Sequence, residues 1–201
     1  MLDWIQRQKI CVTGGGGALG QRLVAALHKQ DAKEVIVFGP QIDITPTENC
    51  LNIKYIAGSI LNPNDLESAF SGCTLVFHLA ALTHAGSSDI TPTSYWDINC
   101  LGTLRVLEAC RKFGIPRVVY TSTGHVYGIP NSLPVTEDHP TRPISNYAAS
   151  KLAGEQVIQG YAASYGLSGI IARLSNLYGY GLGEDTVIGL ALNHAAKGTS
   201  L

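Results

Sequence analysis

The sequence has no marked excess of charge of either sign and no long apolar run. Its 201 residues carry 14 basic and 15 acidic side chains, with no basic stripe interleaved with aromatics, so we expect no nucleic-acid partner. No apolar stretch approaches the ~20 residues of a membrane span, and the first residues do not have the pattern of a secretory signal. We therefore expect a cytoplasmic protein without a membrane partner.

The cysteines follow no disulfide or metal pattern. The five cysteines are an odd number, and no two of them form C-x-x-C. Cys11 falls in an expected strand and Cys110 in an expected helix. We interpret the cysteines as reduced core thiols and predict no metal site.

Short apolar segments alternate with helical patterns along the chain. Strands are expected over residues 9–13, 35–38, 53–57, 74–81, 117–122 and 169–174. Helical spacing runs from Leu19 to Leu27 and from Ile98 to Leu107, the second pattern ending near Lys112 and Gly114. Apolar strands separated by helices predict a doubly wound parallel α/β sheet in one domain spanning residues 1–201. Residues 127–145, with four prolines, are expected to form a long loop.

Glycine, by contrast, is abundant, and four consecutive glycines follow the first apolar segment. A helix that begins just after such a loop offers unpaired N–H groups to a pyrophosphate, and glycine lets the backbone approach closely. A flexible turn without a ligand is the alternative. Gly15, Gly17 and Gly20 spell G-x-G-x-x-G, whereas Gly14, Gly17 and Gly20 spell G-x-x-G-x-x-G; the loop alone leaves both registers open.

The acidic residue that usually follows such a loop is missing. A dinucleotide site commonly has an acid about twenty positions on, at the end of the second strand, to bind the ribose. Here Gly39, Pro40 and Gln41 occupy that place, and no basic residue is there to receive a 2′-phosphate. The choice between NAD and NADP is therefore open.

A second pattern, "NYAASK", places Tyr147 and Lys151 four residues apart at the start of an expected helix. The spacing puts phenol and ammonium on one helix face. A neighbouring cation lowers the pKa of a tyrosine toward the range in which it can act as an acid or base. An exposed helical pair is the alternative. Tyr147 follows the hydroxyl cluster "YTST", which lies at the carboxyl end of the fifth strand, where open α/β sheets bind ligands.

Six segments of the chain, taken together, resemble the extended short-chain dehydrogenases/reductases, the NAD-dependent epimerase/dehydratase group. They are "VTGGGGALG", "VFHLAA", "DINCLGT", "VVYTSTGHVYG", "YAASK" and "RLSNLYG". The resemblance covers nearly the whole chain and implies a Rossmann-type fold with the G-x-x-G-x-x-G register. It implies NAD as cofactor, with NADP left open. The cofactor-binding residues that it implies are Gly14, Gly17, Ala18, Leu19, Gly20, Ser59, Ile60, Leu79, Ala80, Ala81, Tyr147 and Lys151.

The resemblance also implies catalytic roles. Tyr147 would be the general acid/base, and Lys151 would hold the nicotinamide ribose while lowering the tyrosine's pKa. Thr123 would hydrogen-bond the reacting oxygen, with Ser122 as the alternative one position away. Asn99, placed within a helix despite its poor propensity there, would be an active-site asparagine.

Further residues bear on the substrate. Ser122, His125 and Asn176 are expected to face it, although an ordinary packed or pocket-lining role for His125 is equally open. Arg173 is expected to be structural. Dehydratases of the group carry Asp-Glu after the threonine, whereas Gly124 and His125 stand here, which argues against a 4,6-dehydratase.

These features support three hypotheses about function. The first is hydride transfer at a hydroxyl or carbonyl carbon of a nucleotide sugar. The second is a 3β-hydroxysteroid dehydrogenase-like enzyme acting on an apolar alcohol, because "VTGGGGALGQR" also resembles the start of those proteins. The third is a non-catalytic NAD(P)-binding sensor or scaffold.

The sequence departs from the family pattern at Ser59 and at its C-terminal end. Ser59 stands where the family has an aspartate that meets the adenine, which weakens recognition there. The sequence stops at "AAKGTSL", where the family continues into a substrate-binding lobe, so we expect that lobe to be largely absent. The resemblance implies a homodimer formed by the helices that carry "YAASK" and "DINCLGT".

Overall fold

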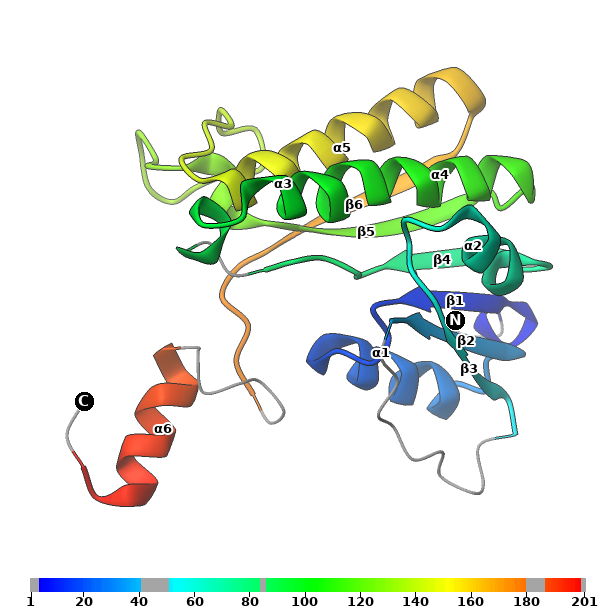
Figure 1. The fold of residues 1–201 in the computed structure, drawn as a ribbon, viewed down its shortest axis with the longest axis horizontal. Helices are drawn as coiled ribbons and strands as arrows, with labels where there is room; N and C mark the ends of the chain where they lie inside the picture. Colours follow the sequence, from blue (N-terminus) through cyan, green and yellow to red (C-terminus); the bar gives the residue numbers. More distant parts are fainter. Residues whose placement is uncertain (1–3, 41–50, 84–85, 180–186, 200–201) are drawn as a thin grey trace.

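The computed structural model describes residues 4–40, 51–83, 86–179 and 187–199 (Figure 1). Six parallel strands form one sheet in the order β3-β2-β1-β4-β5-β6. The order reverses between β1 and β4, and ligands bind at the carboxyl ends of strands flanking such a switch point. The predicted doubly wound fold is confirmed. The strands are β1 (Lys9–Thr13), β2 (Glu34–Gly39), β3 (Ile53–Ala57), β4 (Leu75–His78), β5 (Arg117–Thr123) and β6 (Ser168–Leu174).

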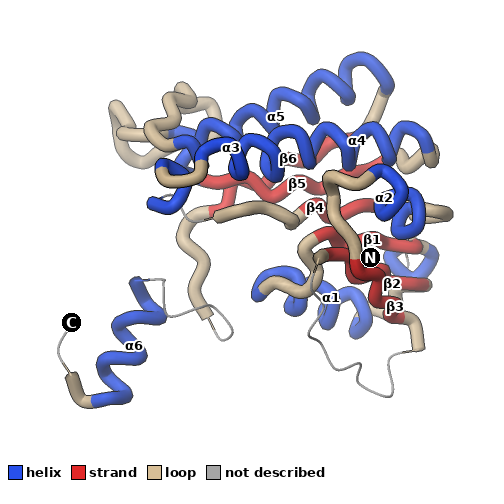
Figure 2. The backbone as a smooth tube through the Cα atoms, in the orientation of Figure 1, coloured by secondary structure: helices blue, strands red, loops and turns tan. Residues whose placement is uncertain are grey.

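Helices cover the two faces of the sheet unequally (Figures 1 and 2). The face formed by Phe38 and its neighbours packs against Leu66, Leu107 and Ile158 of α2, α4 and α5, whereas the opposite face packs against Val24 of α1. Figure 1 shows α6 apart from the sheet. The helices are α1 (Ala18–Lys29), α2 (Pro63–Phe70), α3 (Pro92–Tyr95), α4 (Gly102–Lys112), α5 (Asn146–Tyr165) and α6 (Val187–Lys197).

Two elements differ from the sequence prediction. β4 ends at His78 rather than residue 81, because the apolar residues that follow leave the sheet and line a pocket. The helix expected from Ile98 onward contains a π-turn, Trp96–Leu101, before α4 begins. Such turns concentrate at functional sites. The predicted end is confirmed, since α4 ends at Lys112 and Gly114 has φ +64°.

The long loop after β5 is confirmed. A 3₁₀ turn, Gly124–Tyr127, follows β5 directly, and no helix or strand occurs from Gly128 to Ser145, a stretch that is described throughout. Ser145 then caps α5: its hydroxyl accepts the backbone N–H of Ala148 at 3.2 Å. This cap fixes where α5 begins, and so places Tyr147 in its first turn.

Cys11, Cys73 and Cys110 are buried free thiols, and Cys100 is partly exposed; Cys50 lies outside the described residues. Burial raises the pKa of Cys73 to about 11, so this thiol stays protonated at neutral pH. Of the helices in the described ranges, none has the length and apolar character needed to cross a bilayer.

Candidate functional site

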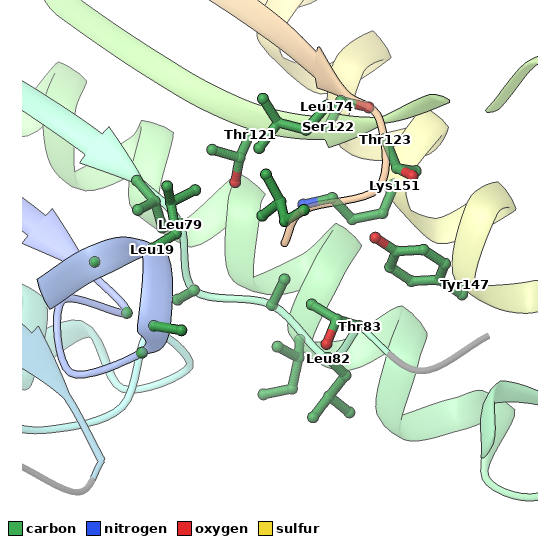
Figure 3. A pocket seen from close by; sticks show the side chains of 18 of the residues that line it. Leu19, Leu79, Leu82, Thr83, Thr121, Ser122, Thr123, Tyr147, Lys151 and Leu174 are labelled. Carbon is green, nitrogen blue, oxygen red and sulfur yellow. The ribbon is translucent and has the colours of Figure 1, made fainter. Parts of the chain in front are cut away.

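A cavity of about 900 Å³ opens at the carboxyl edge of the sheet (Figure 3). It lies between the glycine loop, the segment after β4, the ends of β5 and β6, and the start of α5. Of the predicted site residues, all but Asn99 line it. The lining ones are Gly14, Gly17, Ala18, Leu19, Gly20, Ser59, Ile60, Leu79, Ala80, Ala81, Ser122, Thr123, His125, Tyr147, Lys151 and Asn176.

Close backbone packing explains why glycine is needed at several positions of the glycine run. Gly14 has φ +69°, and a Cβ on it would lie 2.7 Å from the backbone nitrogen of Ala80. A Cβ on Gly20 would collide with the Gly14 carbonyl. Gly15 does not line the pocket; its Cβ would lie 2.8 Å from Val37 Cγ1. The pocket glycines are therefore those of the G-x-x-G-x-x-G register, and Gly15 is small because of the sheet behind it.

The start of α1 faces the cavity with bare amides. Gly17 is the N-cap and has no side chain to accept a hydrogen bond from the first turn. Ala18 and Leu19 follow it in the pocket lining. Unpaired N–H groups and the positive end of the helix dipole suit a phosphate at this position.

The far end of the cavity, beside β2 and β3, has no charged side chain among its described lining residues. Gly39, Pro40 and Ser59 line it, while Gln41 lies outside the described residues. A Cβ on Gly39 would have no atom within 4 Å. The nearby carboxylate of Asp65, on α2, is already engaged: its Oδ2 accepts the backbone N–H of Ser59 at 2.8 Å.

At the other end of the cavity, three side chains of the proposed acid/base group lie near one another (Figure 3). Thr123, Tyr147 and Lys151 are buried, with exposed fractions of 5%, 9% and 2%. The Lys151 ammonium lies 4.1 Å from the centre of the Tyr120 ring. Lys151 also lines the cavity.

The protonation of this group differs in one respect from the sequence prediction. Burial lowers the pKa of Lys151 to about 7, and the charge of Glu155 partly opposes that shift. Burial raises the pKa of Tyr147, and hydrogen bonding with Thr123 partly opposes it. Lys151 is not among the groups that shift the pKa of Tyr147 in this structure, in which its ammonium lies over the Tyr120 ring.

Asn99 does not line the cavity, and its predicted catalytic role stays a prediction. It lies in the π-turn, 1% exposed, and its amide holds Leu82 at both backbone groups, 2.9 Å and 3.0 Å away. It also donates to Ser150 Oγ at 3.1 Å, and that hydroxyl donates to the Tyr147 carbonyl at 2.8 Å. Asn99 therefore supports the cavity wall and the start of α5 from behind.

One buried histidine near the site, His78, was not among the predicted site residues. His78 Nδ1 lies 2.7 Å from Thr13 Oγ1, and Nε2 lies 3.0 Å from Thr103 Oγ1. Because Thr103 donates its proton to the Asn99 carbonyl at 2.6 Å, its oxygen accepts from Nε2, and Nδ1 accepts from Thr13. Burial lowers the pKa of His78 to about 3, so the ring is neutral. The available signal was a histidine within an apolar strand.

The remaining lining residues were not named individually as site residues from the sequence, although several lie in the segments "YTST", "DINCLGT" and "RLSNLYG". They are mostly apolar or small, and they come from the segment after β4, the π-turn, β5, the end of β6 and the residues that follow it. They include Leu82, Thr83, Ile98, Thr121, Leu174, Ser175 and Leu177.

The sequence profile of the NAD dependent epimerase/dehydratase family matches residues 10–201. The chain belongs to this family. A putative UDP-glucose 4-epimerase of Methanocaldococcus jannaschii is 36% identical over 200 residues, covering 95% of this chain and 64% of the relative. The chain thus spans less than two thirds of that family member.

Solved structures of nucleotide-sugar epimerases and dehydratases have a fold similar to that of this chain. A UDP-N-acetylglucosamine 4-epimerase from Methanobrevibacter ruminantium M1, in complex with UDP-N-acetylmuramic acid, superposes with a TM-score of 0.89 at 29% identity, covering 96% of this chain and 64% of that one. A dTDP-glucose 4,6-dehydratase double mutant from Streptomyces venezuelae, with NAD bound, gives 0.88 at 30% identity, covering 96% and 63%.

Proposed function

We propose that the chain forms the cofactor-binding and acid/base part of an NAD-dependent enzyme acting on a nucleotide sugar. The observation that carries the proposal is one cavity that joins the glycine loop at one end to Thr123, Tyr147 and Lys151 at the other. The reaction we infer is hydride transfer at a hydroxyl-bearing carbon, as in a sugar epimerase.

The residues present fit NAD. The positions of Gly14 and Gly20 have no space for a Cβ, yet both line the cavity, and the first amides of α1 suit its pyrophosphate. The buried Lys151 ammonium suits the ribose hydroxyls. When bound, NAD supplies the hydride acceptor. Gly39 and Pro40 offer no cation for a 2′-phosphate. Titrations with NADH and NADPH, followed by cofactor fluorescence, test this: NADH should bind more tightly, and equal or absent binding would contradict it.

The acid/base work falls to Tyr147. Its phenol oxygen would take the proton of the substrate alcohol and return it to the carbonyl oxygen in the reverse direction. Thr123 would hydrogen-bond the same oxygen. Because burial raises the pKa of Tyr147, the phenol is protonated at neutral pH, and a nearby positive charge on Lys151 is needed to favour the phenolate. Keeping Lys151 charged is therefore part of the proposed chemistry.

Epimerase-type chemistry is favoured over the alternatives. Gly124 and His125 follow Thr123, so the acidic pair expected of a 4,6-dehydratase is absent from that position. The relatives compared above are named for nucleotide sugars rather than sterols. The complete Thr123, Tyr147 and Lys151 set argues against a non-catalytic scaffold, which has no use for an acid/base tyrosine.

Incubation with NAD and a panel of UDP- and dTDP-sugars tests the proposed reaction. NMR spectroscopy should detect the epimeric sugar with the wild-type protein, and Tyr147→Phe should abolish its formation. Conversion of a steroid alcohol alone would select the dehydrogenase alternative. NADH binding with no turnover of either class would favour the sensor.

We further propose a homodimer through α4 and α5. Leu101 and Leu104 are each 38% exposed and border a surface groove that Tyr161 of α5 also lines. An apolar patch of this kind suits a partner surface. A monomeric mass at micromolar concentration would contradict it. The cytoplasmic location stays a prediction.

A further inference from the structure

Glu155 of α5 is a completely buried carboxylate that joins several elements. The Ser122 hydroxyl of β5 donates to its Oε1. Arg173 of β6 donates through Nη2 to Oε2 at 2.8 Å and through Nε to Oε1 at 3.1 Å. The same guanidinium donates to the Tyr127 hydroxyl at 2.9 Å and to the Glu137 carbonyl at 3.1 Å. One carboxylate thus ties α5 to the ends of two strands and, through Arg173, to the loop after β5.

The location of this cluster links it to the site. Ser122 directly precedes Thr123, so the hydrogen bond to Glu155 fixes the backbone from which Thr123 projects. Glu155 follows Lys151 by one helical turn and Tyr147 by two, which places all three on one face of α5. The cluster therefore lies directly behind the proposed acid/base group.

Several described charged or titratable groups surround Lys151, and Glu155 is the one carboxylate among them. From β5 the Tyr120 ring faces the ammonium at 4.1 Å. From β4 comes His78, which is neutral. From α5 itself come Tyr147 and Glu155. Burial lowers the pKa of Lys151, and Glu155 is the group whose charge raises it.

We propose that Glu155 is a positioning residue for the acid/base group: it anchors Thr123 through Ser122 and supplies the negative charge one turn from the Lys151 ammonium. The inference rests on the proposed function only in the role given to Lys151. A purely structural ion pair is the competing explanation, because breaking a buried pair destabilises a fold whatever its function. The two are distinguished by the titration of Lys151, which a structural role would leave unchanged.

The decisive experiment follows the lysine Cε resonances by NMR in protein labelled with ¹³C at that carbon. The chain has seven lysines, and Lys151→Met assigns the resonance of Lys151. In the wild type this lysine should titrate near pH 7. In Glu155→Gln, which keeps the shape and loses the charge, the midpoint should fall by about one pH unit. Glu155→Asp, which keeps the charge, should stay near the wild-type midpoint.

A matched control is Glu67→Gln. Glu67 is an exposed carboxylate that pairs with Lys112 at 3.3 Å on the surface, so the same chemical change there should leave Lys151 unmoved. If Glu155→Gln is less stable but titrates at the wild-type pH, the residue is structural and the proposal is wrong.

A second variant covers failure of Glu155→Gln to fold. Glu155→Gln with Arg173→Met removes both charges of the pair, which is often tolerated where removing one is not. Arg173 is not among the groups that shift the pKa of Lys151, so the double variant should also lower the midpoint by about one unit. An unchanged midpoint in this variant would overturn the proposal.

Turnover separates this inference from the proposed function. If the wild type converts a nucleotide sugar, kcat should fall with rising pH in both proteins. The midpoint of that fall should lie at a lower pH in Glu155→Gln than in the wild type, with little change in KM. If the wild type converts none, the proposed function fails, while the NMR titration still decides the role of Glu155.

Discussion

Restoring an acid at the end of β2 should tighten NAD binding. Gly39 lines the cavity at the place where dinucleotide sites usually carry the acidic residue that binds the ribose. A Cβ there meets no atom within 4 Å, and Gly39 is not among the residues with positive φ, so Gly39→Asp should be accommodated without strain. A charge-assisted hydrogen bond contributes about 1.5–3 kcal/mol, which corresponds to roughly a 10- to 150-fold lower Kd.

Fluorescence titration with NADH measures the effect directly. NADPH provides an internal contrast, because its 2′-phosphate would meet the new carboxylate and bind more weakly. Gly160→Asp is the matched control, since Gly160 lies on α5 away from the cavity lining and also has open space at its Cβ. Unchanged NADH affinity in Gly39→Asp, with the fold intact, would show that the ribose does not lie at this end of the cavity.

Other substitutions test separate parts of the structure. Tyr147→Phe should abolish turnover and change NADH affinity by less than about threefold, or 0.7 kcal/mol; retained turnover would refute its role. Gly14→Ala should cost more than about 2 kcal/mol in thermal unfolding, from positive φ and contact with the Ala80 backbone, whereas Gly160→Ala should stabilise α5 by about 0.5–1 kcal/mol. Asn99→Ala should cost about 2–3 kcal/mol, measured by urea unfolding, because Leu82 and Ser150 lose partners; a neutral effect would contradict its supporting role. For His78, whose folded pKa is about 3 against 6.5 unfolded, the unfolded chain takes up the proton first as pH falls. Its stability contribution is complete above pH 6.5 and is lost below it by up to about 1.4 kcal/mol per pH unit; denaturation of His78→Gln should lack this component.

The strands could be predicted closely from the sequence because the runs of β1, β2, β4 and β5 are largely buried, and the edge strands β3 and β6 carry apolar runs as well. β1 and β3 match their predicted limits, and β2, β5 and β6 extend theirs by one or two residues. The prediction for β4 was too long because Leu79, Ala80 and Ala81 are apolar for a different reason: they line the cavity. Apolar character does not distinguish a sheet interior from a pocket wall.

The site was predictable where motifs are local and unpredictable where distant residues meet. Tyr147 and Lys151 lie one turn apart, so their spacing alone places them on one face. The π-turn keeps the apolar spacing of an ordinary helix, and Asn99 within it is buried behind the cavity wall, where it holds Leu82. The contacts of Glu155 join residues 33 and 18 positions away in the sequence, a pairing that no local pattern signals.

Hydride transfer itself tests the central proposal most directly. Purified protein is mixed with NAD and then with the nucleotide sugar that binds best, and the ultraviolet absorbance of reduced nicotinamide is followed in a single turnover. The proposed chemistry predicts that this absorbance rises with the wild-type protein and stays flat with Tyr147→Phe. Bound NAD that is never reduced by any nucleotide sugar, or reduction that is unchanged in Tyr147→Phe, would contradict it.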